Sequence, residues 1–269
     1  VAGVLGSFSE KLSLSLLWRH YDRHFHSFYG NAFGESTRNI NESGVYWGLK
    51  FNPTRRVTFT AYYDTYRFPW LRYRVDAPSD GFDYLLRLAY RPSKKLLLYA
   101  QYREEHRDRN PPNPMAPIHV PTRTMRQQYL LNVDVQANEV VSLRSRVQFS
   151  TFEQTTRTGG YALIQDANFR LKRWQLGTRL ALFDTDDYDN RQYVFEKDVL
   201  YSFTVPAYYR QGLRYYLLLN YDVNRKMSVW LRFARTTLTS EQTIGSGLEE
   251  INGPTRSDVR VQVRYLFGK

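Results

Sequence analysis

The chain has 269 residues, of which 38 are Lys or Arg and 26 are Asp or Glu, so its formal net charge is +12. It has no cysteine, which excludes disulfides and thiolate metal sites, and no apolar run near the ~18 residues that a membrane helix needs. Its aromatic content of 16% argues against a disordered chain. The positive charge favours anionic partners such as nucleic acid, lipopolysaccharide phosphates or acidic solutes.

Segments in which apolar and polar residues alternate recur along the whole chain, and each predicts a β-strand. No helical period competes with this pattern. In chain order the segments lie at residues 12–18, 45–51, 57–63, 84–90, 96–102, 129–135, 141–149, 161–169, 174–182, 213–221, 227–233 and 259–267.

A soluble sandwich and a transmembrane barrel both produce such alternation. The connections favour the barrel, because tight ones at 52–56, 91–95, 136–139, 171–173 and 222–226 contrast with long polar ones. The long connections occupy 24–43, 68–81, 104–124, 152–159 and 239–257. Tyr and Trp near the segment ends are typical of interfacial aromatic belts.

The sequence therefore predicts an all-β fold, an antiparallel up-and-down transmembrane β-barrel with short turns at one rim and long loops at the other. Strict alternation of turns and loops fails between 185 and 212, where either Pro206 and Gly212 bracket an outer loop or a strand is merged or split. We expect about 14 strands, within 12–16, in one barrel domain over 1–269. The missing initiator Met and signal segment at Val1 indicate a mature or partial chain.

The alternation assigns residues to the two faces of the predicted barrel. Those expected to meet lipid are Leu16, Phe59, Leu88, Leu131, Val147, Leu180, Leu231 and Val261. The basic residues expected in the lumen are Lys50, Arg56, Arg87, Arg103, Arg126, Arg144, Arg146, Arg170, Arg179, Arg214, Arg232, Arg260 and Arg264.

The lumen-side acids Asp64, Asp83, Asp134 and Asp166 are too few to neutralise these cations, which predicts an anionic occupant or permeant. The alternative is a lumen closed by internal salt bridges and loops.

No cluster of residues predicts catalysis or a cofactor. His20, His24 and His26 read as a solvated rim, and a barrel hydrolase with a Ser–His pair is only the alternative function. We expect no metal site, and the weak candidates form an acidic surface loop without the Gly of an EF-type site. These candidates are Asp184, Asp186, Asp187 and Asp189.

Four stretches carry a resemblance to a known family: "HSFYGNAFGES" (26–36), "RFPWLRYRVDAPS" (67–79), the run at 181–209 and the run at 243–265. They resemble the C-terminal barrel of Bacteroidota helix-hairpin-helix domain-containing outer-membrane proteins. The resemblance implies that the chain is the barrel portion of a longer protein in the outer membrane of a Gram-negative bacterium. The last strand, with Val263, Tyr265 and Phe267, is similar to the insertion signal of such barrels.

The predicted function is that of a channel, translocation component or structural partner in an outer-membrane complex, and not of an enzyme. The expected partners are outer-membrane lipid, lipopolysaccharide and other outer-membrane proteins. A DNA-handling role at the envelope, with nucleic acid as partner, follows only from the family's helix-hairpin-helix units.

Overall fold

A computed structural model describes residues 1–27, 30, 33–111 and 117–267 of the chain. The chain divides into two compact units, which are described separately: unit 1 is Val1–Arg91, Tyr99–Tyr129 and Thr151–Arg157, and unit 2 is Pro92–Leu98, Leu130–Ser150 and Thr158–Lys269. The elements are β1 (Ala2–Ser7), β2 (Leu12–Tyr21), β3 (Glu42–Thr54), β4 (Val57–Phe68), β5 (Ser79–Ser93), β6 (Leu96–Arg109), β7 (Thr122–Gln136), β8 (Val141–Glu153), β9 (Arg157–Leu171), β10 (Trp174–Thr185), β11 (Gln192–Tyr193), β12 (Ala207–Tyr208), β13 (Gly212–Asp222), β14 (Met227–Leu238), β15 (Thr243–Ile244), the 3-10 helix η1 (Gly247–Glu249), β16 (Ile251–Asn252) and β17 (Thr255–Tyr265).

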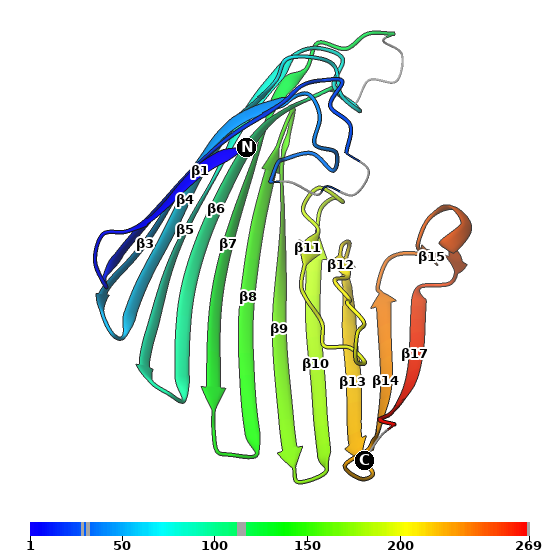
Figure 1. Ribbon diagram of the computed structural model, residues 1–269. Helices are drawn as coiled ribbons and strands as arrows, with labels where there is room; N and C mark the ends of the chain where they lie inside the picture. Colours follow the sequence, from blue (N-terminus) through cyan, green and yellow to red (C-terminus); the bar gives the residue numbers. More distant parts are fainter. Residues whose placement is uncertain (28–29, 31–32, 112–116, 268–269) are drawn as a thin grey trace. The chain divides into compact units, whose positions relative to one another are not determined.

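Thirteen long strands form one sheet in the order β1 to β10, then β13, β14 and β17 (Figure 1). The expected all-β antiparallel meander is confirmed, with 13 strands in the described residues where we expected about 14. The sequence pattern missed β1, which pairs with β2, because Gly3 and Gly6 interrupt its alternation. No described helix is long and apolar enough to cross a membrane.

The connections alternate in length, with two exceptions to the predicted layout. The connection expected over 152–159 is a short turn, since β8 ends at Glu153 and β9 begins at Arg157. The region between 185 and 212, for which the sequence left two interpretations open, is a single long connection over 186–211. It joins β10 to β13, its neighbour in the sheet, and holds the two-residue strands β11 and β12. Of the Pro-rich loop at 110–121, residues 112–116 lie outside the described residues.

Each long strand has an apolar face and a polar face. None of the eight residues expected to meet lipid is buried: Phe59 and Val147 are half-buried and the other six are exposed. Leu231 faces Val261 in the register of β14 and β17, so these side chains share the apolar face. An exposed apolar sheet face of this extent is what a lipid-facing barrel wall requires.

Aromatic pairs flank the apolar face of unit 2 at both ends. Phe149 meets Tyr161 at 6.5 Å near one end, and Trp174 stacks on Tyr221 at 4.1 Å at the other. Tyr161 and Leu171, the partner of Trp174, lie ten residues apart on β9. Ten residues extend about 34 Å, which a tilt of about 40° reduces to about 26 Å, close to the ~25 Å apolar band of outer-membrane barrels.

Two neighbouring positions on β17 test this assignment of faces. Val261 is 66% exposed on the apolar face, whereas Gln262 lies on the polar face opposite Trp230. We expect Val261→Lys to destabilise the chain folded in lipid vesicles by about 2–4 kcal/mol. Gln262→Lys should destabilise it much less. Urea titrations of both variants in one lipid give the comparison, and equal losses would show that the faces are misassigned.

Candidate functional site

The long connection of unit 2 folds back over the polar face as a hairpin. Residues 192–208, here called the inner hairpin, include the β11–β12 pair and a bridge between Glu196 and Thr204. In Figure 1 the hairpin is the yellow-green segment drawn in front of β10 and β13. The connection bonds to the strand end through Thr185 N and Arg210 O, whereas Lys197 reaches Gly177 on β10, eight residues away. The connection therefore extends along about 27 Å of the strand.

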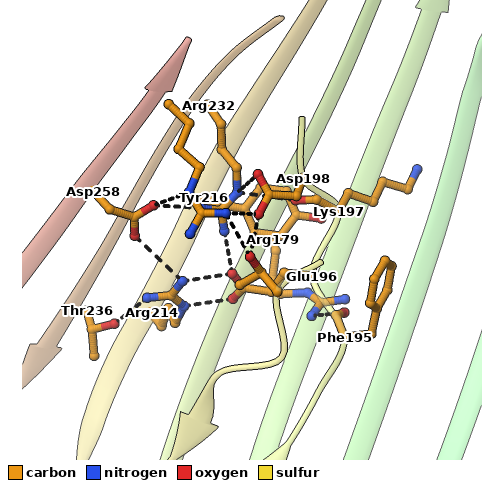
Figure 2. Close-up of polar contacts among 12 residues, drawn as sticks. Arg179, Phe195, Glu196, Lys197, Asp198, Arg214, Tyr216, Arg232, Thr236 and Asp258 are labelled. Atoms are coloured by element: carbon orange, nitrogen blue, oxygen red, sulfur yellow. Dashed lines mark hydrogen bonds and ion pairs between the residues drawn. The ribbon is translucent and has the colours of Figure 1, made fainter. Parts of the chain in front are cut away.

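Glu196 anchors the inner hairpin. Its fully buried carboxylate accepts hydrogen bonds from Arg214 at 2.7 and 2.8 Å and from Arg232 at 2.6 Å. The hydroxyl of Tyr208 donates to the same carboxylate at 2.9 Å. Burial raises the pKa of Tyr208, so its phenol stays protonated as the donor. A hairpin carboxylate thus joins two arginines from two sheet strands (Figure 2).

Asp198 and Asp258 complete this ionic cluster. The fully buried Asp198 side chain accepts a hydrogen bond from Arg260 on β17 and lies 3.7 Å from the Nε of Arg232. Asp258 accepts from the Nη1 of Arg232 at 2.8 Å. Arg232 has no exposed side-chain surface and faces three carboxylates, so leaving it without them would cost several kcal/mol.

Arg179 attaches the hairpin to β9 and β10. Its guanidinium forms a bidentate pair with Asp166 at 2.5 and 2.7 Å, and its Nη1 donates to the carbonyl of Phe195 at 2.8 Å. The ring of Tyr216 lies between two cations, 5.7 Å from Arg179 and 5.3 Å from Arg232. The charge cluster therefore also packs against an aromatic face, which adds to its stability.

Apolar contacts support both sides of the ionic cluster. One buried group contains Phe183, Val194, Tyr208 and Leu238, and another contains Val199, Tyr216, Leu218 and Trp230. The hairpin supplies Val194, Val199 and Tyr208. Burial of these side chains contributes roughly 1.5–3 kcal/mol each and makes the hairpin a packed element of the polar face.

Unit 1 holds a separate buried cluster on its polar face. Arg19, fully buried, donates from Nε to Glu42 at 2.5 Å and from Nη1 to Asp64 at 2.8 Å. The backbone amides of Glu35 and Ser36 also donate to Glu42. The connection between β2 and β3 is therefore held to the strands by one carboxylate, as the inner hairpin is held by Glu196.

Two further ion pairs lie near this cluster in unit 1. Arg103 binds Asp83 through bonds of 2.5–3.1 Å, and Tyr62 donates to the same carboxylate at 3.0 Å. Arg107 pairs with Glu35 of the connection between β2 and β3. Burial raises the pKa of Glu35 although Arg107 opposes this shift.

The expected shortage of acidic groups is wrong for much of the polar face. Each of the four predicted aspartates pairs with an arginine: Asp64 with Arg19, Asp83 with Arg103, Asp134 with Arg144, and Asp166 with Arg179. Further acids that the sequence reasoning missed add to them, among them Glu42, Glu196, Asp198 and Asp258. The pairing extends to Arg214, Arg232 and Arg260, so these cations are neutralised within the protein.

The remaining predicted basic residues bind uncharged groups, lie exposed, or face the interior of the sheet's polar side. Arg87 binds the amide of Gln101, Arg146 that of Asn132, and Arg264 the hydroxyl of Ser228. Lys50, Arg56 and Arg170 are exposed near the short turns, and no carboxylate pairs with them within the described ranges. Arg126 lies on the polar face of β7, on the same side as the buried Thr124 and Asn132. Exposed basic charge without a carboxylate partner in the described ranges therefore lies toward the short-turn end, at Lys50, Arg56 and Arg170.

The candidate metal region, the acidic loop at 184–189, has a structural role. Asp186 accepts from the amide of Gly159, and Asp187 accepts from Thr158 and Asn190, so these acids order their own loop. Asp184 binds Gln211, and Asp189 lies 3.9 Å from Arg191. No group of three metal-ligating side chains occurs in the described part of the chain.

A Ser–His pair is present on the apolar face of unit 1, near the long-loop end. The Nδ1 of His20 lies 2.7 Å from the Oγ of Ser43, and its ring is parallel to that of Trp18 at 6.2 Å. Nucleophilic catalysis also needs a third group that orients the base. Among the described residues no acid bonds to His20, so the pair is an incomplete catalytic arrangement.

A weak sequence signal for the missed acids does exist. Asp258 alternates in step with Arg260 and Arg264, and Glu196 and Asp198 alternate in "FEKD". The partners of Glu196 lie 18 and 36 residues further along the chain, so only the folding of the hairpin onto the sheet brings them together.

Comparisons with known proteins agree with this architecture. No family model and no curated protein matches the chain. The chain is similar to the copper transporter OprC, with a TM-score of 0.50 and 12% identity over 93% of this chain and 47% of that chain. It also aligns with a Pseudomonas aeruginosa FadL homologue (TM-score 0.39, 10% identity, 97% of this chain and 74% of that one) and with the deltaS2S3 mutant of the monoaromatic hydrocarbon channel TodX (0.36, 10%, 95% and 78%).

The strand meander, its exposed apolar face and the likeness to OprC define the class. The chain has the all-β fold of outer-membrane β-barrels. It spans about half the length of that transporter.

Proposed function

We propose that the chain is the barrel of an outer-membrane channel or translocation component in a Gram-negative bacterium, with a lumen narrowed by the inner hairpin. The observation that carries this proposal is the buried anchor of Glu196 on Arg214 and Arg232, which holds a long connection against the polar face. A scaffold that only spans the membrane would not need a connection packed along so much of a strand. The likeness to a transporter supports the same role.

Ion preference follows from the uneven pairing of charges on the polar face. The arginines that bind Glu196 and Asp198 are neutralised, whereas Lys50, Arg56 and Arg170 lie exposed toward the short turns. We propose that this end attracts anions, and that the resulting selectivity is modest because the narrowest part is charge-balanced.

Planar-bilayer recordings test the channel. Replacing residues 192–208 by a short Gly-Ser linker should raise single-channel conductance several-fold, because the segment that fills the polar face is removed. In a salt gradient the reversal potential should have the sign of an anion-selective pore, and its magnitude should fall as ionic strength rises. Unchanged conductance after hairpin removal would refute the proposed constriction, and cation selectivity would refute the anion preference.

A non-catalytic role is part of this proposal, and the incomplete His20–Ser43 pair supports it. We also propose lipopolysaccharide and other outer-membrane proteins as partners. Membership of the Bacteroidota helix-hairpin-helix family is proposed on the four resembling stretches alone, and nucleic acid as a partner depends on that family.

A further inference from the structure

A cavity of about 200 Å³ lies in unit 2 where the tip of the inner hairpin meets the polar face. The hairpin contributes Lys197, β9 contributes Asn168 and Arg170, and β13 and β14 contribute Leu218 and Trp230. A volume of this size holds a small solute of a few water-sized groups and is too small for a polymer segment. The side chains that line the cavity are not those of the ionic cluster that anchors the hairpin, although Lys197 lies between Glu196 and Asp198 in the chain.

Side-chain amides dominate the polar lining. Gln136, Asn168, Gln175 and Asn220 all face the cavity, and each amide can both donate and accept hydrogen bonds. The Oδ1 of Asn220 is buried and has no hydrogen-bond partner. An unsatisfied buried acceptor is costly, so a donor from a bound solute would stabilise this site. Hydroxyl groups match such a lining because they also donate and accept.

Two cations give the cavity a positive character. The Nζ of Lys197 donates to the Oδ1 of Asn168 at 2.5 Å, and Arg170 is exposed. The stem of Lys197 passes Gly177, where an added Cβ would lie 3.3 Å from the Asn168 oxygen and 3.8 Å from the lysine Cδ. The Lys197 stem therefore lies in van der Waals range of β10, and its ammonium group extends to Asn168 at the cavity. Glu139 is the single acidic residue among those that line it.

We infer that this cavity binds a small hydroxylated anion of the sugar-phosphate class. Lys197 and Arg170 would contact the phosphate, the amides would bind the hydroxyl groups, and Trp230 with Leu218 would contact the carbon skeleton. A role in permeation rests on the proposed channel function, whereas binding itself does not.

Isothermal titration of the full chain in detergent micelles tests the inference with glucose 6-phosphate, glucose and inorganic phosphate. Glucose 6-phosphate should bind at least about tenfold more tightly than either of the other probes, because only it engages cations and amides together. Lys197→Met and Arg170→Gln should each weaken its binding by about tenfold or more, the usual effect of losing a charge-assisted hydrogen bond. The carbonyl of Lys197, not its side chain, accepts from Arg232 at 3.2 Å, so this hairpin contact survives the substitution.

Lys172→Met is the matched control, since Lys172 is an exposed lysine in the β9–β10 turn outside the cavity. Its variant should bind glucose 6-phosphate as the original chain does. Phosphate binding as tightly as the sugar phosphate, equal weakening by Lys172→Met, or no binding at about 10 mM would each overturn the inference. Sugar-phosphate binding by a chain that shows no conductance in planar bilayers would refute the channel alone. Hairpin-dependent conductance without binding would refute this site alone.

Discussion

Glu196→Gln should release the inner hairpin from the polar face while the sheet stays folded. The substitution keeps the shape of the side chain but removes the charge that Arg214 and Arg232 share, both of which lie in buried surroundings. Breaking a buried ion pair in this way costs about 3–5 kcal/mol. Hydrogen–deuterium exchange should therefore accelerate over residues 192–208 and remain slow in β10, β13 and β14.

An exposed ion pair of the same unit provides the control. Glu241 lies 3.2 Å from Arg210, whose side chain is exposed while that of Glu241 is partly exposed, so Glu241→Gln should cost less than about 1 kcal/mol and leave the hairpin protected. If Glu196→Gln changes exchange no more than this control does, the carboxylate is not the anchor. Equal acceleration in the three strands would instead show that the hairpin and sheet unfold as one unit.

Alternation along the strands was enough to predict the architecture and both faces. In β10 the exposed Leu180 and Leu182 alternate with the buried Arg179 and Ala181, and such local periodicity can be read without knowing the partner strands. The wrong expectation of a long loop at 152–159 has a local cause. Thr155, Thr156 and Gly159 are turn-compatible residues, and composition alone does not tell where hydrogen bonding to β9 resumes.

The candidate site could not be predicted in the same way because it depends on where a connection folds. Arg179, Arg214 and Arg232 lie on the polar face of their strands, yet their charge balance depends on acids such as Glu196 and Asp198, which lie on no strand of the main sheet. The arginines that Glu196 and Asp198 bind lie 18–62 residues away in the chain, and no short-range pattern reports contacts of that separation.

In unit 1, Arg19→Met should be as disruptive as the loss of Glu196. Arg19 is fully buried, bonds Glu42 and Asp64, and lies 5.2 Å from the ring of Phe33. Without the guanidinium, two carboxylates remain buried side by side with no cation between them. We expect the free energy of unfolding in lipid vesicles to fall by about 3–5 kcal/mol, measured by urea titration.

A charge-neutral triple variant separates electrostatics from packing in this cluster. Replacing Arg19 by Met, Glu42 by Gln and Asp64 by Asn removes all three charges, so most of the lost stability should return, since uncompensated charge is the main cost. Arg67→Met is the matched control, because Arg67 is exposed on β4 and should change stability by less than about 0.5 kcal/mol. Should the triple variant be no more stable than Arg19→Met, the contribution of Arg19 would come from its contact with Phe33 and the surrounding packing instead of from its charge.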